Sequence, residues 1–358
     1  MSNILLASDL HVHSHKNSQR RLIHCLEALE WIFKTAIERK IKNVLFLGDL
    51  FQDREKILTL PYQLTYEIIN KYCGKNGKGI NLYLLVGNHD MWFADKSDIS
   101  SVYPFGSIEN VKIISRCETH NIEGLNVDFL PFTLNPPKSL AEFKKRSPIL
   151  CGHIALDGAQ LNTFFKTQAD VSVEYDGDMV KVDSSLLKDW QRVFLGHYHG
   201  EQRIEHVEYI GSPLQLNFAE AFQKKHIIIL DTDDLSTEYV ENTFSPIHLI
   251  ISEDQLPKYN LDNVFLRLQP KDINSTDLVE LKKKITENNN ILTFELSSSN
   301  SDDDIEDTKQ TMQESTSLLL NTNNDMLVEY VDAVGTGGKD RDRLIAIGNL
   351  LRQKSQME

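Results

Sequence analysis

The chain has 358 residues, of which 41% are hydrophobic and 25% are charged, and its formal net charge is −14. These values are typical of a globular protein with one large core and one or two smaller units, and no apolar run approaches the roughly 18 residues of a membrane span. The acidic surplus argues against a general nucleic-acid coat, although bound divalent cations would reverse the charge locally.

The cysteines and the N-terminus narrow the class of protein further. The four cysteines, at 25, 73, 117 and 151, form no C-x-x-C pair. A zinc knuckle, a redox motif or a disulfide framework is therefore not expected. The first residues, MSNILLASDLHVHS, carry no basic n-region and only a short apolar stretch. We therefore expect no signal peptide and a cytoplasmic protein.

The first hundred residues alternate between strand-like and helix-like segments. Apolar runs predict strands at 3–8, 43–49 and 81–88. Apolar residues at helical spacing predict helices at 21–40 and 62–72. This alternation indicates βαβ units that feed a largely parallel sheet.

Shorter apolar runs follow, with fewer helices between them. They lie at 111–115, 125–131, 148–153, 192–197 and 226–231. Each has the length of a buried strand. We interpret these five runs as a second sheet that packs on the first.

The chain changes character after about residue 245. An apolar run at 263–269, a helical pattern at 277–285 and a second run at 291–296 predict a small β-α-β unit. This unit carries no cluster of metal-ligand residue types. We therefore assign 246–296 to a small α+β unit that is separate from the body at 1–245.

Beyond this unit the sequence becomes polar and acidic. The stretch SSSNSDDDIEDT cannot bury apolar area, which predicts a flexible linker at 297–312. Two apolar stripes in 313–358 predict short helices that cannot sustain a core alone. They either dock on the body or hold another protein in a helix-in-groove contact, and the long linker favours the second interpretation.

Polar clusters stand where five of the predicted strands end. They are Asp9 and His11 in SDLHVH, Asp49 in GDLF, Asn88, His89 and Asp90 in GNHD, His153 in CGH, and His197 and His199 in GHYH. A lone histidine is more often a core residue than a ligand. In α/β sheets, however, sites form at the carboxyl ends of strands, so five clusters in this order predict one shared crevice.

The residue types indicate a metal site. Aspartate, asparagine and histidine offer oxygen and nitrogen ligands without thiolate, which suits manganese, iron or zinc at expanded coordination. In D-x-H and H-x-H, the side chains at i and i+2 lie on one side of an extended segment and can reach one ion. The ligands are too many for a single ion and fit two ions with a shared carboxylate.

The series D-x-H, G-D, G-N-H-D, G-H and G-H-x-H, over roughly residues 1–220, resembles the calcineurin-like metallophosphoesterase superfamily. Within it, GDLF, GNHD, GHYHG and YIGSPLQLNF (209–218) resemble the SbcD-type double-strand-break repair nucleases of bacteria and phages. The resemblance implies an α/β fold, with a two-sheet α-β-β-α sandwich at 1–245 and a capping domain at 246–296. It also implies that the helical segment at 313–358 binds an SbcC-type ABC ATPase.

The resemblance also implies a role for each site residue. One ion would be held by Asp9, His11, Asp49 and His199, and a second by Asp49, Asn88, His153 and His197. Asp49 would bridge the two ions, which are expected to be Mn²⁺, with Mg²⁺ as the alternative. His89 would approach the scissile phosphate without binding metal, and Asp90 would orient His89 by a hydrogen bond. Some relatives have histidine where this chain has Gln52, so no substrate contact is inferred at that position.

The implied activity is cleavage of DNA as a 3′-to-5′ exonuclease and single-strand endonuclease, in an SbcCD-like complex for DNA repair and recombination. A hydroxide that bridges the ions would attack phosphorus, and His89 would stabilise the leaving oxygen. The implied partners are DNA, the ATPase and a second copy of the chain, in the cytoplasm of a bacterium or a phage-infected host. The predicted helices at 21–40 and 62–72 are candidates for the contact between copies.

Two other interpretations stay open. A phosphatase of proteins or small molecules is one, but such members usually read GD-x-x-D-R-G and GNHE. Here Glu55 follows Asp53 and Arg54, and Asp90 stands in place of the glutamate. The other is a non-catalytic scaffold on the same fold, but decay normally deletes ligands and none is missing.

Overall fold

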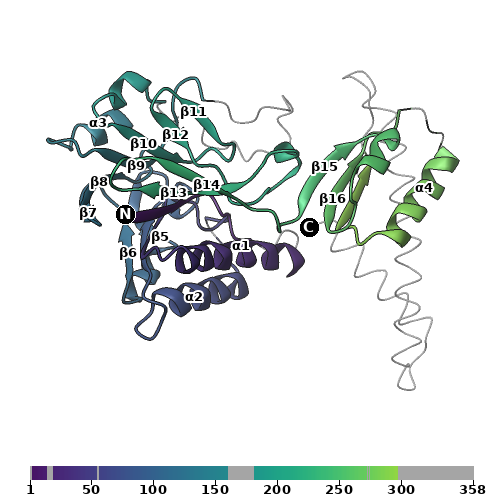
Figure 1. Ribbon diagram of the computed structural model, residues 1–358, viewed down its shortest axis with the longest axis horizontal. Helices are drawn as coiled ribbons and strands as arrows, with labels where there is room; N and C mark the ends of the chain where they lie inside the picture. Colours follow the sequence, from purple (N-terminus) through teal and green to yellow (C-terminus); the bar gives the residue numbers. More distant parts are fainter. Residues whose placement is uncertain are drawn as a thin grey trace. The chain divides into compact units, whose positions relative to one another are not determined.

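The computed structural model contains two six-stranded sheets, which lie in the left half of Figure 1. The structure describes residues 2–13, 19–54, 56–159, 181–271, 273 and 275–296, which all fall within the unit Met1–Ser297. The linker predicted at 297–312 and the helices predicted at 313–358 lie outside these residues.

The first sheet has the strand order β14-β13-β1-β2-β3-β6. Its strands are β1 (Asn3–Ala7), β2 (Asn43–Phe46), β3 (Asn81–Leu85), β6 (Val111–Ile114), β13 (His226–Asp231) and β14 (Thr237–Glu241). From β1 to β6 the neighbours are parallel, whereas β13 runs antiparallel to β1 and to β14. Helix α1 (Gln19–Glu38) connects β1 to β2 and helix α2 (Thr59–Cys73) connects β2 to β3, so the predicted βαβ units are confirmed.

The second sheet has the order β11-β12-β10-β9-β8-β7. Its strands are β7 (Glu118–Ile122), β8 (Leu125–Leu130), β9 (Ile149–His153), β10 (Arg192–Gly196), β11 (Gln202–Ile204) and β12 (Val207–Tyr209). The prediction that 111–115 and 226–231 belong to this sheet is wrong, because β6 pairs with β3 and β13 pairs with β1. An apolar run indicates a buried strand, but it carries no information about the partner of that strand.

Side chains of β1 alternate between two cores, as the strand period of two requires. Leu5 and Ala7 pack beneath the helices, whereas Ile4 and Leu6 pack between the two sheets. All four are buried. Burial on both faces explains why β1 is a continuous apolar run, and each fully buried aliphatic side chain contributes roughly 1.5–3 kcal/mol.

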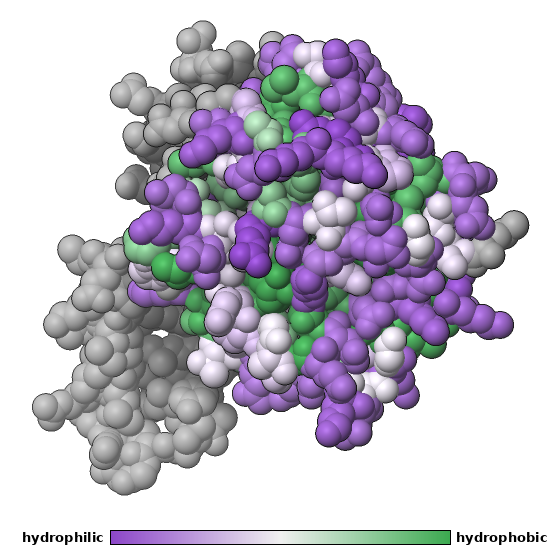
Figure 2. Space-filling view, turned by 90° about the vertical axis from the view of Figure 1, so that its left-hand side faces the viewer, coloured by the Kyte–Doolittle hydropathy of each residue, from purple (hydrophilic) through white to green (hydrophobic). Residues whose placement is uncertain are grey.

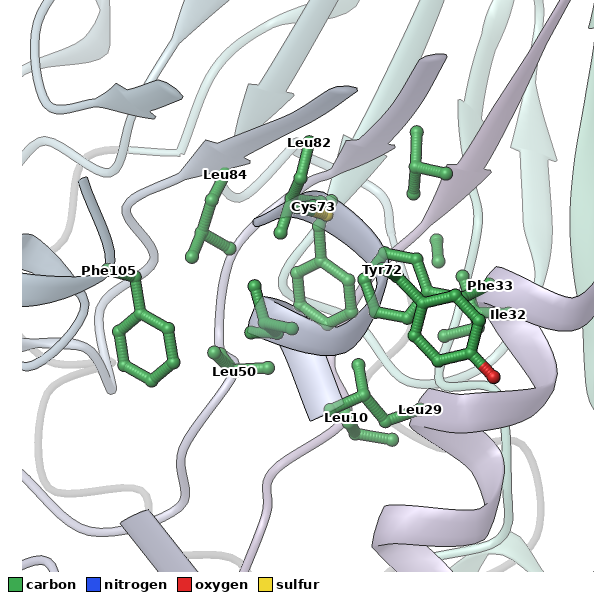
Figure 3. Packing of buried hydrophobic residues seen from close by; sticks show 14 of the residues in the cluster. Leu10, Leu29, Ile32, Phe33, Leu50, Tyr72, Cys73, Leu82, Leu84 and Phe105 are labelled. Carbon is green, nitrogen blue, oxygen red and sulfur yellow. The ribbon is translucent and has the colours of Figure 1, made fainter. Parts of the chain in front are cut away.

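Helices α1 and α2 cover the outer face of the first sheet (Figure 1). Apolar residues recur at helical spacing along α1, so that Leu29, Ile32 and Phe33 lie in one core with residues of the sheet and α2 (Figure 3). The ring of Phe33 stacks on that of Tyr72 from α2, with centroids 4.9 Å apart. The hydrophobic face of each helix is therefore used in packing on the sheet and on the other helix.

The outer face of the second sheet is covered by short helical segments. Leu150 and Val193 of this sheet pack in one core with Leu140 of helix α3 (Pro136–Leu140) and Leu187 of the 3-10 helix η3 (Ser184–Leu187). Together with α1 and α2 on the other side, these layers have the order α-β-β-α. The predicted fold class is confirmed.

A third, smaller sheet follows the two large ones. Its strands β15 (Ile247–Ile251), β16 (Val264–Leu268) and β17 (Thr293–Leu296) are parallel, with helix α4 (Ser275–Asn288) between β16 and β17. The 3-10 helix η5 (Glu253–Lys258) precedes β16. The predicted strand-helix-strand elements are thus present, and β15 adds a strand that the sequence pattern did not indicate. The boundary of a capping domain at 246 stays a prediction.

The remaining elements are short. They are the hairpin of β4 (Met91–Phe93) and β5 (Lys96–Ser100) and the 3-10 helices η2 (Tyr103–Ser107) and η4 (Phe218–Glu220). Hydrophilic residues cover most of the coloured face in Figure 2, with hydrophobic residues visible between them. Within the described ranges, every helix is too short or too polar to span a membrane.

Candidate metal centre

The predicted site residues come from the carboxyl ends of strands in both large sheets. In the first sheet, Asp9 and His11 follow β1, Asp49 follows β2, and the GNHD loop follows β3. In the second sheet, β9 ends at His153, and His197 and His199 follow β10. Loops at these ends bring side chains that lie up to 188 residues apart into hydrogen-bond distance. Within each sheet these strands are parallel, so their carboxyl ends lie at one edge, and the packing of the two sheets brings the two edges together.

The backbone is strained at the site residues themselves. Asp9, His11, Asp49 and His197 have φ angles of 54°, 50°, 57° and 100°, in the left-handed region that L residues rarely adopt. Each such residue costs on the order of 1–3 kcal/mol. Gly48 has a φ of 96°, and a Cβ there would lie 2.4 Å from Nδ1 of His153. The fold thus holds several strained residues together at one place, which is typical of a functional site.

One group of ligand atoms is formed by Asp9, His11 and His199, whose atoms all lie within 4.8 Å of one another. The Nε2 atoms of His11 and His199 are 3.0 Å apart. Two imidazole nitrogens at this distance cannot both carry a proton that points at the other, so at least one presents its lone pair. An Asp9 oxygen lies 3.9 Å from Nε2 of His11. These atoms could hold a divalent cation.

A second group is formed around Asn88. Its Oδ1 lies 3.0 Å from Nε2 of His153 and 3.0 Å from Nδ1 of His197. Nδ1 of His153 lies 2.6 Å from the carbonyl oxygen of Leu47, to which it donates, so its Nε2 is available toward the crevice. This Nε2 also lies 3.2 Å from Oδ2 of Asp49.

Asp49 connects the two groups. Its Oδ2 lies 3.6 Å from Nε2 of His11 in the first group and 3.2 Å from Nε2 of His153 in the second. Its Oδ1 accepts a hydrogen bond of 2.8 Å from the backbone N–H of His89. The carboxylate is therefore fixed on one side by the GNHD loop and faces both groups on the other.

Charge and burial act against each other in the crevice. Burial alone would lower the pKa of His153, but the carboxylates of Asp49 and Asp9 raise it to about 9. Burial lowers the pKa of His197 to about 3, so this ring is neutral at pH 7. Burial opposes the ionisation of Asp49, but His153 and His89 hold the pKa of this carboxyl well below its usual range. The Asp49 carboxyl is therefore ionised in the crevice, and an ionised carboxylate can accept a cation.

The donor set fits two divalent cations. It comprises carboxylate and amide oxygens and imidazole nitrogens, the combination that manganese, iron and zinc accept. Nε2 of His11 lies 3.0 Å from Nε2 of His199 and 3.6 Å from Oδ2 of Asp49, so it faces both groups. Two groups that share Asp49 are the arrangement that a two-ion site needs.

His89 lies at the margin of the two groups and is partly exposed. Its Nδ1 is 2.7 Å from the carbonyl oxygen of Gln52, and its ring meets that of His11 edge-on, with centroids 4.8 Å apart. One of its nitrogens lies within 4.8 Å of ligand atoms of His11 and Asp49. The position suits a residue that contacts a substrate, but proximity alone does not separate this role from metal binding.

Asp90 does not orient His89, and this prediction is wrong. Its carboxylate is buried and accepts four backbone N–H groups, from Gly87, Asp49, Leu50 and Phe51, at 3.0, 2.9, 3.0 and 3.3 Å. The carbonyl of Gln52 takes the place that Asp90 was expected to occupy beside His89. Burial and the Asp49 charge raise the pKa of Asp90 to about 7, whereas the N–H donors act in the opposite direction. Asp90 ties the GNHD loop to the GDLF loop.

Sequence reasoning missed a group of residues behind His199. Nδ1 of His199 lies 3.0 Å from Oε1 of Glu220, and Oε2 of Glu220 lies 2.7 Å from Nζ of Lys225. Burial opposes the ionisation of Glu220, but Lys225 and His199 lower the pKa of this carboxyl. The available signal was a single acidic residue in the otherwise apolar stretch FAEAF, which begins at the last residue of the YIGSPLQLNF motif.

Comparison with known proteins agrees with this architecture. The sequence matches the family described as calcineurin-like phosphoesterase over residues 2–229, which is more than half of the chain. Among solved structures, TT1561 of Thermus thermophilus is 14% identical with a TM-score of 0.39, and the match covers 67% of this chain and 98% of that one. At this score, the fold assignment rests on the family match and on the chain's own sheet order.

Two relatives are nucleases by name. "Exonuclease subunit 1" of Enterobacteria phage T4 is 27% identical over 233 residues, which cover 60% of this chain and 63% of the phage protein. The match thus spans less than two thirds of the phage protein's length. The SbcD component of nuclease SbcCD from Escherichia coli K12 is 24% identical over 285 residues, which cover 68% of each chain. The resemblance to SbcD-type nucleases is confirmed, and the chain belongs to the calcineurin-like phosphoesterase family.

Proposed function

We propose that this protein is a metal-dependent phosphodiesterase that cleaves DNA, the nuclease subunit of an SbcCD-like complex. The observation that carries the proposal is the pair of ligand groups joined by Oδ2 of Asp49, which lies 3.6 Å from His11 and 3.2 Å from His153. The names of the two relatives, an exonuclease subunit and a nuclease subunit, support a nucleic acid rather than a phosphomonoester as the substrate, and we propose DNA.

The residues would divide the work as follows. Asp9, His11, Asp49 and His199 would hold one ion, and Asp49, Asn88, His153 and His197 the other. We propose Mn²⁺ for both, with Mg²⁺ as the alternative. When bound, such ions neutralise phosphate charge and lower the pKa of water towards neutral. Asp90 would hold the two loops that carry Asp49 and His89 in register.

His89 would act on the substrate. Its ring borders the crevice, and the Gln52 carbonyl oxygen at 2.7 Å accepts from Nδ1. With its proton on Nδ1, or on both nitrogens when charged, the ring keeps a fixed orientation. Only the charged ring carries a proton on Nε2 as well, and this proton can be donated to the oxygen that leaves phosphorus, a contribution typically of about 10²–10⁴ in rate.

Two variants test the division between binding and chemistry. His89→Ala should retain both ions and lose about 10²–10⁴ of cleavage rate. Asp49→Ala should lose the ions, because both groups lose a ligand. Metal analysis after gel filtration, together with cleavage of an oligonucleotide in Mn²⁺, measures both quantities. Equal metal loss in the two variants would show that His89 is a ligand and would overturn the roles assigned here.

The choice of substrate is tested on the wild-type protein. Plasmid and oligonucleotide cleavage in Mn²⁺ should exceed hydrolysis of a chromogenic phosphomonoester. End-labelled oligonucleotides would report the expected 3′-to-5′ polarity and the single-strand endonuclease activity. Efficient phosphomonoester hydrolysis without DNA cleavage would favour the phosphatase interpretation, and inactivity towards both with bound metal would favour the scaffold.

The partners are proposed on the same basis. We propose a capping domain at 246–296, a linker at 297–312 and a segment at 313–358 that binds an SbcC-type ABC ATPase in DNA repair and recombination. Co-expression with such an ATPase, with and without residues 309–358, tests this directly. Loss of co-purification on removal of the segment is the expected result, and retention would contradict it.

We also propose a homodimer. Leu58 and Leu60 at the start of α2 are 50% and 48% exposed, and Tyr103 is 69% exposed. Such side chains are candidates for a contact between copies. If these side chains form the contact between copies, Leu60→Glu should lower the mass measured by light scattering from that of a dimer to that of a monomer. A wild-type protein that is monomeric at micromolar concentration would exclude the homodimer.

A further inference from the structure

A buried carboxylate stands directly behind one of the proposed metal ligands. Glu220 is 1% exposed, and its Oε1 lies 3.0 Å from Nδ1 of His199. The opposite nitrogen of the same ring, Nε2, faces Nε2 of His11 at 3.0 Å. Glu220 is not one of the proposed ligands, and it meets the ring on the side away from the ligand group.

The other oxygen of Glu220 is saturated by donors. Its Oε2 lies 2.7 Å from Nζ of Lys225, 3.1 Å from Oγ of Ser212 and 3.2 Å from the backbone N–H of Leu216. Lys225 is also buried, and its Nζ donates to the carbonyl oxygen of His199 at 2.8 Å. One oxygen of the carboxylate therefore accepts from Lys225 and Leu216, and the other is left for the imidazole. The single Ser212 proton can go to Oε2 or to the carbonyl oxygen of Leu214, which is 3.0 Å from Oγ.

This arrangement determines the tautomer of His199. An ionised carboxylate can only accept hydrogen bonds, so Nδ1 of His199 must carry the proton that Oε1 accepts. In a neutral ring the other nitrogen, Nε2, then has a free lone pair. That lone pair points into the group formed with Asp9 and His11.

We propose that Glu220 is a positioning residue, which keeps Nε2 of His199 unprotonated and aimed at the ion shared with Asp9 and His11. This inference rests on the proposed function of the site. Carboxylates that accept from a metal-binding histidine generally orient the ring and raise its basicity, and their loss costs about 10–100-fold in metal affinity. Lys225 and Ser212 hold Glu220 in place.

The substitution Glu220→Gln separates this role from simple packing, because it preserves shape. The Lys225 ammonium and the Leu216 backbone N–H cannot accept a hydrogen bond, so the glutamine carbonyl should turn towards them. The amide NH₂ group would then face Nδ1 of His199, which must become an acceptor. The ring proton should move to Nε2, the nitrogen that would otherwise bind the ion.

The first measurement needs no metal. Long-range ¹H–¹⁵N spectra of histidine-labelled, metal-free protein, at a pH where the ring is neutral, report the tautomer of His199. The signal is assigned by its absence in His199→Asn. The wild-type protein should carry the proton on Nδ1, and Glu220→Gln should carry it on Nε2.

The second measurement counts ions. Titration with Mn²⁺ should show that Glu220→Gln lowers the affinity for one of the two ions by about 10–100-fold and leaves the affinity for the other unchanged. Electron paramagnetic resonance at limiting Mn²⁺ should show isolated ions in place of a coupled pair. The matched control is Glu208→Gln, which removes a carboxylate that is equally buried and bound to Arg192 at 2.8 Å, away from the site. That control should bind both ions as the wild type does.

The outcomes are distinguishable. A wild-type His199 protonated on Nε2 overturns the proposal, even if Glu220→Gln fails to fold. The proposal is also overturned if Glu220→Gln keeps the wild-type tautomer and both ions at unchanged affinity. If the wild-type protein binds no Mn²⁺ at saturation, the proposed function fails instead, and the tautomer measurement still decides whether Glu220 sets the proton on His199.

Discussion

Asp90 offers a quantitative test of how the site is held together. Its two oxygens accept four backbone N–H groups from the GNHD and GDLF loops, at distances of 2.9 to 3.3 Å. One of these donors is the N–H of Asp49, the residue that joins the two ligand groups. Changes at Asp90 should therefore reduce both the stability of the fold and the affinity for metal.

The magnitude follows from the donors that are left without a partner. A buried N–H group without an acceptor costs about 1–3 kcal/mol, and such costs are not fully additive. Asp90→Ala leaves four backbone N–H groups without an acceptor and should lower the free energy of unfolding by about 4 kcal/mol or more. Asp90→Asn keeps one oxygen but turns an NH₂ group towards two N–H groups that cannot rotate. The free energy of unfolding of Asp90→Asn should therefore fall by about 2–4 kcal/mol.

Asp128 is the matched control. It is also buried, and it accepts from Thr119 Oγ1 and Ser147 Oγ on one oxygen and from Ser147 N and Trp190 Nε1 on the other. Hydroxyl groups can rotate and accept from an amide, whereas N–H groups cannot. Asp128→Asn should therefore lower the free energy of unfolding by only about 1–1.5 kcal/mol and should leave metal binding unchanged.

Urea denaturation followed by tryptophan fluorescence measures these differences in the free energy of unfolding, and Mn²⁺ titration measures the metal affinity. We expect Asp90→Asn to be the less stable of the two asparagine variants and to bind Mn²⁺ more weakly. Equal losses for Asp90→Asn and Asp128→Asn, or an Asp90→Asn protein within about 1 kcal/mol of wild type, would refute the reasoning.

Three further predictions concern packing, pH and metal. Phe33→Ala should lower the free energy of unfolding by about 3–5 kcal/mol in urea, because it leaves a cavity beside Tyr72, and should not change the number of bound ions. Burial and Arg21 lower the pKa of His248 to about 3, whereas in the unfolded chain this ring has its ordinary pKa of 6.5. Between pH 7 and pH 5 only the unfolded chain takes up this proton, so the free energy of unfolding should fall by about 2 kcal/mol. His248→Phe should flatten that slope in urea titrations at the two pH values, and an unchanged slope would assign it to other groups. The charged groups that act on His248 are Arg21, Glu220, Lys225 and Arg267. Mn²⁺ at 100 times its dissociation constant should raise the free energy of unfolding by about 2.7 kcal/mol per site, and a rise that persists in Asp49→Ala would place the binding elsewhere.

Local patterns in the chain were enough to predict the elements that carry the site. The apolar runs before Asp9, Asp49 and Asn88 are buried parallel strands, and the helices between them lie within a few residues of their expected bounds. Both results depend on periodicities that act over a few residues. The gathering of clusters within one sheet could also be predicted, because parallel strands present their carboxyl ends at the same edge. The meeting of the clusters from β1–β3 with those from β9 and β10 depends on how the two sheets pack.

Pairing and support around the site depend instead on contacts between distant parts of the chain. One partner of β13 is β1, more than two hundred residues away, and the four donors of Asp90 include three from another loop. His199 and Glu220 meet only because the segment after β12 folds back beneath the ring. An acidic residue in the sequence shows that a carboxylate is present, but not which N–H group it accepts from once both are buried. Motifs therefore predicted the residues that face the crevice, and three-dimensional packing was needed to identify the residues that hold them there.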